Sequence, residues 1–240
     1  MRAVVFVSTV ENPEESLALL ELSLDCVPDN EIVNDFDLIA VEAAVQLKES
    51  GDLDEVIVFG MGTELSHLQK CLAMGADSAV IVPCSRAAIT AEDVVETAIS
   101  AFPDKSETIF MLGKLGVNYE SHRTAQILST KLGIPCLNSA YAIHRVKNFW
   151  DITCESELGS PVFRVSAPFV MTADLRLASP RFPSLPNIIR SRKKPVLEVS
   201  YVQSSLPSVL KTVQLEAAHE GHRQCQMLKD CHELRKHLNL

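Results

Sequence analysis

The chain has 240 residues, of which 47% are hydrophobic and 22% are charged, proportions typical of a globular protein. Its net charge of −9 argues against binding to nucleic acid or an anionic membrane, which would repel it, and no apolar run is long enough to span a bilayer. The seven cysteines are scattered and include no C-x-x-C pair, which indicates reduced thiols and a cytoplasmic location.

The first half of the chain alternates between short Val- and Ile-rich runs and segments with helical periodicity. Strands that are apolar along their whole length, separated by helices, are typical of a parallel sheet covered on both faces. We therefore predict an α/β, Rossmann-like, doubly wound parallel sheet with strands at residues 3–7, 56–59, 79–82 and 108–112. The helices are predicted over residues 38–47, 65–74 and 94–101, the last with Thr90 as its N-cap.

Two glycine-rich segments directly follow predicted strands, where doubly wound sheets place their ligands. They are G-M-G-T at residues 60–63 and G-K-L-G at residues 113–116. Glycine lets backbone N–H groups approach a phosphate, and the N-terminus of the helix that follows supplies a favourable potential. Because neither spacing matches a dinucleotide fingerprint or a P-loop, two ordinary strand–helix turns are the alternative interpretation.

A third polar segment, N-D-F-D at residues 34–37, immediately precedes the helix predicted over residues 38–47. In one interpretation Asn34 or Asp35 is simply the N-cap of that helix. In the other, backbone groups of the segment hold an adenine or a ribose. Further along the chain, Arg123 either neutralises a phosphate, for which its guanidinium group is well suited, or faces solvent from a helix.

From about residue 141 the pattern changes to short β-like runs separated by turn-forming residues. The runs at residues 142–146, 150–154 and 162–166 predict an antiparallel meander at the edge of the sheet. Another extended piece is predicted at residues 196–202. The tail over residues 215–240 has helical periodicity but only a narrow apolar stripe, so we expect it to pack on another surface.

An extended C-terminal arm is predicted within residues 169–195, which form a buried strand, a loop stiffened by three prolines and a short basic helix. The loop carries Leu185 at its tip, and a basic run extends from Arg190 to Lys194. A rigid apolar projection beside positive charge suits docking to an acidic protein partner, since rigidity lowers the ordering cost of binding. A solvated helix face is the alternative for the charged residues.

The arm also resembles the signature segment of electron transfer flavoprotein β subunits. The matching stretches are T-A-D-L-R-L at 172–177, P-R at 180–181, L-P-N-I at 185–188 and K-K at 193–194. The resemblance implies a heterodimer with the electron transfer flavoprotein α subunit, which holds the redox FAD. This chain is then an electron-carrier subunit without bond-making catalysis of its own. Electrons arrive from acyl-CoA or other dehydrogenases and leave to a quinone reductase or another acceptor.

Within this resemblance, the arm over residues 172–195 recognises the partner dehydrogenase. Asp174, Arg176 and Arg181 are expected to fix the shape of the arm through ion pairs. Glu155 falls where the family places an acidic residue facing the flavin domain, but a surface glutamate of the meander fits its sequence neighbours better. The residues expected to bind the partner are the anchor Leu185, Pro186, Ile188, Arg190 and Lys193.

The same resemblance implies an adenine-nucleotide pocket, for AMP or a second FAD, at the glycine-rich and N-D-F-D segments. The loop V-N-Y-E-S-H-R at 117–123 belongs cleanly to neither type: it differs from the acidic run and N-Q-T-G of AMP-binding members, and before T-A-Q at 124–126 it lacks both acids of the D-G-D-T-A-Q pattern of members that hold a second FAD. The residues expected to bind the nucleotide are Phe6, Asn34, Asp35, Phe36, Asp37, Met61, Gly113, Lys114, Leu115, Gly116, Val117, Asn118, Tyr119, Glu120, Ser121, His122, Arg123 and Thr124.

We therefore predict an adenine-nucleotide-binding α/β domain over residues 1–200, which includes the arm, and a C-terminal extension over residues 201–240 that packs on the partner subunit. A stand-alone adenine-nucleotide sensor with the same fold is the alternative, although it leaves the arm without a purpose. The tail also contains several His and Cys residues, but their H-x2-H-x2-C-x5-C-H spacing fits no standard zinc site, so no metal is predicted.

Overall fold

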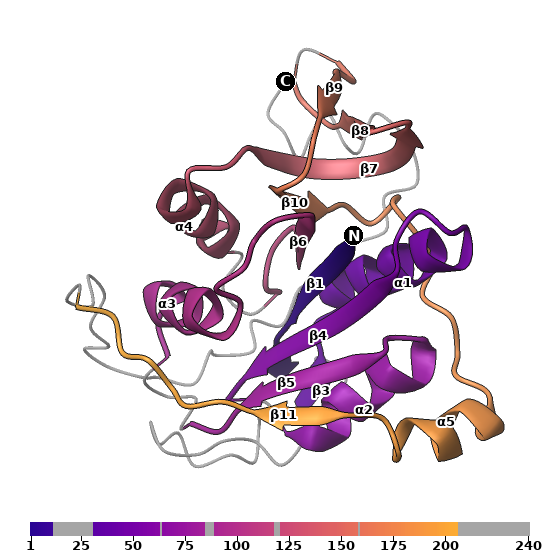
Figure 1. Cartoon of the computed structure of the whole chain (residues 1–240), viewed down its shortest axis with the longest axis vertical. Coiled ribbons are helices and arrows are strands. Elements are labelled where there is room, and N and C mark those ends of the chain that lie inside the picture. The colour runs from indigo at the N-terminus through magenta and orange to yellow at the C-terminus, as the bar shows by residue number, and fades with distance from the viewer. Residues whose placement is uncertain (12–30, 63, 85–88, 118–120, 158, 206–240) are drawn as a thin grey trace, which may run out of the picture.

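The computed structural model describes residues 1–11, 31–62, 64–84, 89–117, 121–157 and 159–205. Its centre is a nine-stranded sheet in the order β11-β5-β4-β1-β6-β10-β7-β8-β9 (Figure 1). All pairings from β11 across to β7 are parallel, whereas β8 pairs antiparallel with both β7 and β9. The strands are β1 (Arg2–Val7), β4 (Glu55–Met61), β5 (Ser78–Val82), β6 (Thr108–Gly113), β7 (Cys136–Val146), β8 (Phe149–Cys154), β9 (Val162–Val165), β10 (Phe169–Ala173) and β11 (Val196–Glu198).

Helices cover both faces of this sheet, as the doubly wound prediction requires (Figure 1). Helices α1 (Asp35–Glu49) and α2 (Leu65–Met74) pack on one face, and α3 (Ala91–Ala101) and α4 (Arg123–Leu132) pack on the other. The central strands are buried on both sides because their alternate residues enter two separate cores. This double burial explains why the strands are apolar along their whole length, and the predicted fold class is confirmed.

The predicted N-cap of α3, Thr90, is confirmed. Thr90 Oγ1 accepts a hydrogen bond from the Asp93 N–H at 3.2 Å, and the Asp93 carboxylate accepts one from the Thr90 N–H at 2.9 Å. This reciprocal capping box satisfies backbone donors that the first helical turn cannot pair. A separate two-stranded sheet of β2 (Thr9–Glu11) and β3 (Glu31–Val33) was not predicted.

The predicted antiparallel meander is confirmed at the sheet edge, although its first strand is longer than predicted. β7 pairs with β10 in parallel over its first residues and then with β8 in antiparallel fashion from Ala140 onward. A register shift between Ala140 and Ala142 and a positive φ of 54° at Ser139 accompany this change of partner, as at a β-bulge. Trp150 and Ile152 of β8 are fully buried and join the meander to the main core.

The arm is a strand, an extended segment and a short helix, as predicted, and it runs past α1 towards α2 (Figure 1). The helix α5 (Leu185–Ser191) starts at Leu185, so this leucine opens a helix and does not stand at the tip of an extended loop. Pro186 lies in the first turn, where a missing N–H is tolerated. The extended piece predicted at 196–202 forms β11 over part of its length and pairs in parallel with β5.

The basic run after α5 is less uniform than predicted. Arg190, Arg192 and Lys193 are exposed, whereas the Lys194 ammonium donates hydrogen bonds to the carbonyl oxygen of Leu72 at 2.9 Å and to that of Ala76. Lys194 therefore caps the C-terminus of α2, where a cation is favoured. The tail helix predicted over residues 215–240 lies outside the described residues.

Candidate functional site

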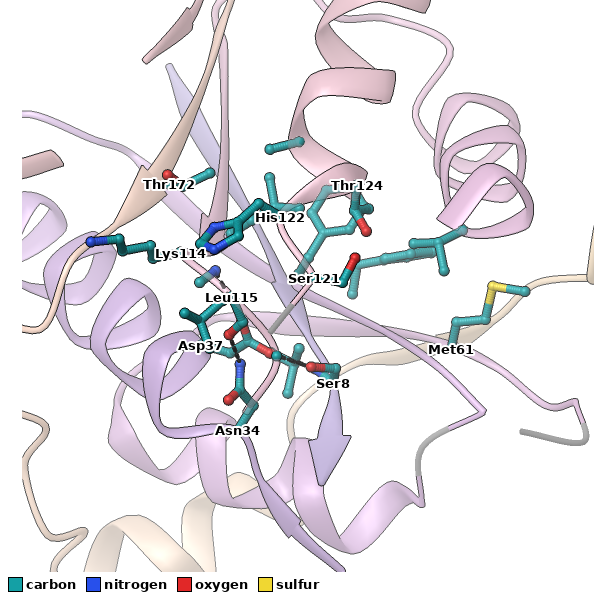
Figure 2. A pocket seen from close by; sticks show the side chains of 18 residues that line it. Ser8, Asn34, Asp37, Met61, Lys114, Leu115, Ser121, His122, Thr124 and Thr172 are labelled. Atoms are coloured by element: carbon teal, nitrogen blue, oxygen red, sulfur yellow. Dashed lines mark hydrogen bonds between the residues drawn. The ribbon is translucent and has the colours of Figure 1, made fainter. Parts of the chain in front are cut away.

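A cavity of about 140 Å³ lies at the carboxyl edge of the sheet, between β1 and β6 (Figure 2). The chain leaves β1 towards β4 and β5 and then returns to β6 on the other side of β1. The cavity therefore occupies the topological switch point, where doubly wound sheets bind their ligands. It is lined by Phe6, Val7, Ser8, Asn34, Asp37, Phe59, Met61, Val94, Leu112, Gly113, Lys114, Leu115, Gly116, Ser121, His122, Thr124, Ala125 and Thr172.

Most of the predicted nucleotide-binding residues that the structure describes line this cavity. Asp35, Phe36, Val117 and Arg123 do not line it, and Asn118, Tyr119 and Glu120 lie outside the described residues. Seven lining residues were not predicted, and they come from strand ends and helix faces: Val7, Ser8, Phe59, Val94, Leu112, Ala125 and Thr172.

Asp37 forms the polar floor of the cavity. One carboxylate oxygen accepts hydrogen bonds from the Ser8 N–H at 2.9 Å and the Ser8 hydroxyl at 2.6 Å, and the other accepts the Gly113 N–H at 2.9 Å. Burial raises the pKa of Asp37 to about 6, although these hydrogen bonds act in the opposite direction. A single side chain of α1 thus joins the carboxyl ends of β1 and β6.

Asn34 occupies the N-cap position of α1, but its side chain makes no capping hydrogen bond. Its Nδ2 atom instead donates to the Leu115 carbonyl oxygen at 2.9 Å, which fixes the loop after β6 to the start of α1 (Figure 2). The Oδ1 atom is buried and has no hydrogen-bond partner among the described residues. An unsatisfied buried acceptor is costly.

The glycine-rich segment at 113–116 does not provide the phosphate-binding backbone that was predicted at its start. Gly113 ends β6, and its N–H is already bonded to Asp37. The next N–H, of Lys114, donates to the Ala173 carbonyl oxygen at 3.0 Å. Gly113 instead serves close packing, because an added Cβ would lie 2.3 Å from Asp37 Oδ1 and 2.9 Å from the backbone carbon of Phe36.

The segment at 60–63 differs from its prediction in the same way. Gly60 and Met61 belong to β4, which extends beyond its predicted end. The Gly62 N–H donates to the Val82 carbonyl oxygen at 3.0 Å and is therefore not free for a phosphate. Of the described residues of this segment, 60–62, only Met61 lines the cavity.

Lys114 lines the cavity, but its ammonium is directed away from the Asp37 floor (Figure 2). It lies 3.2 Å from an Asp174 carboxylate oxygen and 3.5 Å from Glu155 Oε2. Arg176 contacts the same two acids, at 2.8 Å and 2.9 Å, and its guanidinium group lies over the Tyr141 ring. The predicted role of Asp174 and Arg176 in shaping the start of the arm agrees with this network, and Glu155 of the meander is a member of it.

Arg123 forms an ion pair with Glu92 of α3. Its guanidinium group therefore links α4 to α3. Of its two predicted roles, a residue on the surface of a helix describes it better than a phosphate-binding residue. The other helix-start group, His122, is the N-cap residue of α4 and has no side-chain capping bond. The first N–H groups of α4 thus receive no hydrogen bond from the side chain of their N-cap residue.

The predicted partner-binding residues lie together on the arm, away from the cavity. Leu185, Pro186, Ile188, Arg190 and Lys193 are all exposed. Phe182, which was not predicted, is 99% exposed, and Ile189 is also largely exposed. The arm therefore presents an apolar surface edged by positive charge.

Three further observations concern the described part of the chain. No three His, Cys, Asp or Glu side chains there are placed to hold a metal ion, and the His and Cys residues of the tail lie outside it. The four described cysteines, Cys71, Cys84, Cys136 and Cys154, form no disulfide with one another. A helix both long and apolar enough for a membrane span is absent from the same residues.

The fold and the position of the cavity define the class: an α/β protein with a cavity at the switch point of a doubly wound sheet. The electron transfer flavoprotein domain family matches residues 25–204. The chain is 30% identical over 207 residues to the electron transfer flavoprotein subunit beta of Bradyrhizobium diazoefficiens, covering 84% of this chain and 82% of that protein. It is 31% identical over 173 residues to the mitochondrial subunit beta of Arabidopsis thaliana, covering 70% and 68%.

A third relative, the subunit beta of Syntrophomonas wolfei, is 29% identical over 198 residues, covering 82% of this chain and 78% of that protein. The chain belongs to the electron transfer flavoprotein β subunit family. It is accordingly an electron-transport protein and a flavoprotein subunit.

Proposed function

We propose that this chain pairs with an electron transfer flavoprotein α subunit whose FAD accepts electrons from acyl-CoA or other dehydrogenases. The electrons then pass to a quinone reductase or another acceptor. In this proposal the chain performs no bond-making chemistry; it supports the flavin-bearing subunit and presents the arm to the donor. The observation that carries the proposal is the exposed apolar surface of the arm, where Phe182 is 99% and Leu185 is 69% exposed.

An apolar surface of this kind, attached to an acidic protein, needs a partner to cover it. The basic residues beside it favour a partner whose docking cavity is apolar and edged with acids, since complementary charge assists encounter and orientation. Leu185 is then the anchor, and Pro186, Ile188, Arg190 and Lys193 surround it.

The cavity is proposed to hold an adenine nucleotide, either AMP or the AMP half of a second FAD. Its apolar walls, including Phe6, Leu112 and Ala125, suit an adenine ring. The phosphate is assigned to the N-terminus of α4, where Ser121, His122 and Thr124 line the cavity, because the backbone donors of Gly113 and Lys114 are already used.

The cavity is smaller than the roughly 300–1,000 Å³ of typical pockets for small molecules, which suits binding of one part of a nucleotide. We further propose that residues 1–200 form the nucleotide-binding domain and that the extension over residues 201–240 packs on the α subunit beyond Ser204, because Val202 and Ser204 are hydrogen-bonded to α3 of this chain. A cytoplasmic location is proposed for the complex, which the unpaired described cysteines support.

Co-expression with the α subunit tests these proposals. The purified heterodimer is expected to contain the FAD of the α subunit and one adenine nucleotide bound to this chain. Flavin absorbance and chromatography of the released nucleotides measure both. One FAD with one AMP would identify AMP in the cavity, and two FAD would identify a second flavin. A chain that is monomeric in size-exclusion chromatography, binds ATP by itself and does not associate with the α subunit would instead support the stand-alone sensor.

A pair of variants tests the cavity directly. A Cβ at Gly116 would have no heavy atom within 4 Å, so Gly116→Phe is expected to fill the cavity without a backbone clash and to abolish nucleotide retention. Val117→Phe is the matched control, because Val117 is exposed and does not line the cavity. Equal nucleotide content in the two variants would place the nucleotide elsewhere.

A further inference from the structure

Arg181 connects the arm to α1 through its guanidinium group and its backbone N–H. Its guanidinium group lies 2.8 Å from each Glu42 carboxylate oxygen and forms a two-point contact of 2.6 and 2.8 Å with Glu49. The Arg181 backbone N–H also donates to Glu42 at 3.2 Å. Planar, paired contacts of this kind hold a guanidinium group in one orientation.

Glu42 is the unusual member of this contact, because its side chain is 3% exposed on a helix whose neighbouring residues form the core. A buried carboxylate is unfavourable unless it is paired and hydrogen-bonded. Its two side-chain partners are Gln46, one turn away, at 2.8 Å and Arg181, 139 positions away. The buried charge on α1 therefore has its cation on the arm.

A second contact holds the far end of the arm. Ser191 at the end of α5 is buried, and Lys194 donates hydrogen bonds to two carbonyl oxygens at the C-terminus of α2. Residues 182–190 lie between these two attachments, and this segment carries the exposed Phe182 and Leu185. The segment is thus held at its start by the Arg181 ion pairs and further along by α5, which packs on α2.

We infer that Arg181, held by Glu42, is a positioning residue for partner recognition: it fixes the arm so that Phe182 and Leu185 are presented in one geometry before the partner arrives. Arg181 directly precedes Phe182, so its attachment sets the direction in which the chain leaves α1. Preorganisation reduces the free energy lost when the arm is ordered in a complex. The inference rests on the proposed docking function of the arm.

The test compares heterodimers that carry the native chain or the double variant Glu42→Gln/Arg181→Met. Changing both partners avoids leaving a buried charge unpaired, so the domain is expected to stay folded. Hydrogen exchange of the amides at 182–190 is expected to accelerate at least about tenfold, while exchange in β1 and β6 stays unchanged, as in a local opening. The control is Asp151→Asn/Arg164→Gln, which removes a two-point ion pair from the meander and is expected to leave the arm unchanged.

Unchanged exchange in the arm would overturn the inference, and so would faster exchange throughout the sheet, since Arg181 would then hold the fold and not the arm. The second measurement is reduction of the heterodimer's flavin by a purified acyl-CoA dehydrogenase. A higher KM for the heterodimer with an unchanged kcat is expected. Faster arm exchange with an unchanged KM would support the attachment of the arm by Arg181 and would overturn the proposed role of the arm in docking.

Discussion

The Asp37 carboxylate accepts the Gly113 backbone N–H at 2.9 Å and thereby joins the first turn of α1 to the end of β6. The same side chain holds Ser8 at the end of β1. The three elements that meet at the switch point are therefore connected through one buried acid. The cavity floor depends on how closely Gly113 approaches α1.

Gly113→Ala is expected to destabilise the protein by about 1–3 kcal/mol, the range for overpacking in a rigid interior. The new Cβ would lie 2.3 Å from Asp37 Oδ1 and 2.9 Å from the Phe36 carbonyl carbon, and the latter belongs to the backbone and cannot rotate away. Urea unfolding followed by the fluorescence of Trp150, the single tryptophan, measures the change. The control is Gly116→Ala, where a Cβ meets nothing within 4 Å; equal losses in both variants would refute the packing role of Gly113.

The stability of the fold is expected to depend on the protonation of Asp37. Its pKa rises from 3.8 to about 6 because burial disfavours the charged form, so the folded state binds the proton more tightly than the unfolded state. The resulting stabilisation, up to about 3 kcal/mol at roughly 1.4 kcal/mol per pKa unit, is complete below about pH 3.8 and is lost as the pH rises through about 6. The free energy of unfolding, measured by urea titration from pH 4 to 7, is expected to fall more in the native protein than in Asp37→Asn.

Other carboxylates also titrate in this range, but they are common to both proteins and cancel in the difference. A native-minus-variant difference that stays constant from pH 4 to 7 would show that Asp37 titrates like an exposed acid. Direct observation of its carboxyl carbon by NMR, assigned by its absence in the variant, gives the pKa independently.

Asp174 and Glu155 share the same two cations, Lys114 and Arg176, but differ in burial, with side chains 8% and 48% exposed. Burial opposes the ionisation of Asp174, yet the hydrogen bonds from Arg176 and Lys114 outweigh it and lower its pKa. Asp174→Asn is therefore expected to cost about 1–3 kcal/mol of stability, whereas Glu155→Gln is expected to cost less than about 0.5 kcal/mol, as exposed pairs do. The urea midpoints at pH 7 measure both, and a larger loss for Glu155→Gln would contradict this assignment of the network.

The sequence predicts the fold well where a pattern of apolar residues continues over a whole helix or strand. Strands buried on both faces are recognisable from their apolar composition, and α2 matches its predicted residues because its apolar periodicity and its terminal Gly75 agree. The β2 and β3 strands have three residues each, too few for a period to be seen. The length of β7 was not predicted because this one strand pairs in parallel with β10 and antiparallel with β8 within the same sheet.

The candidate site was predictable in position but not in its hydrogen bonds. The rule that ligands lie beyond strand ends locates the cavity. If the rule is applied to the residues at the end of each strand, it also identifies Val7, Ser8 and Leu112. Val94 and Ala125 enter the cavity from helices, which only the packed structure shows. The use of the Gly113 N–H by an acid 76 positions earlier leaves no local signal, so the phosphate-loop interpretation could not be corrected from the sequence.

Leu185→Ala is expected to weaken recognition of the donor without affecting the fold. A side chain that is 69% exposed contributes little to stability, so the free energy of unfolding should change by less than about 0.5 kcal/mol. If Leu185 is buried in the complex, its loss removes about 1.5–3 kcal/mol of apolar contact, equivalent to roughly a 10- to 100-fold rise in Kd. Steady-state reduction of the heterodimer by a purified acyl-CoA dehydrogenase gives the corresponding rise in KM.

Phe182→Ala is expected to raise the KM as well, because Phe182 is the most exposed large apolar side chain of the described residues and lies on the same arm. The control is Leu197→Ala, a leucine of β11 that is 59% exposed but lies outside the arm. Rates for Leu185→Ala equal to those of Leu197→Ala with every candidate dehydrogenase would remove Leu185 as the anchor. A rise in KM for Phe182→Ala alone would move the anchor three residues towards Arg181, next to the contact that holds the arm on α1.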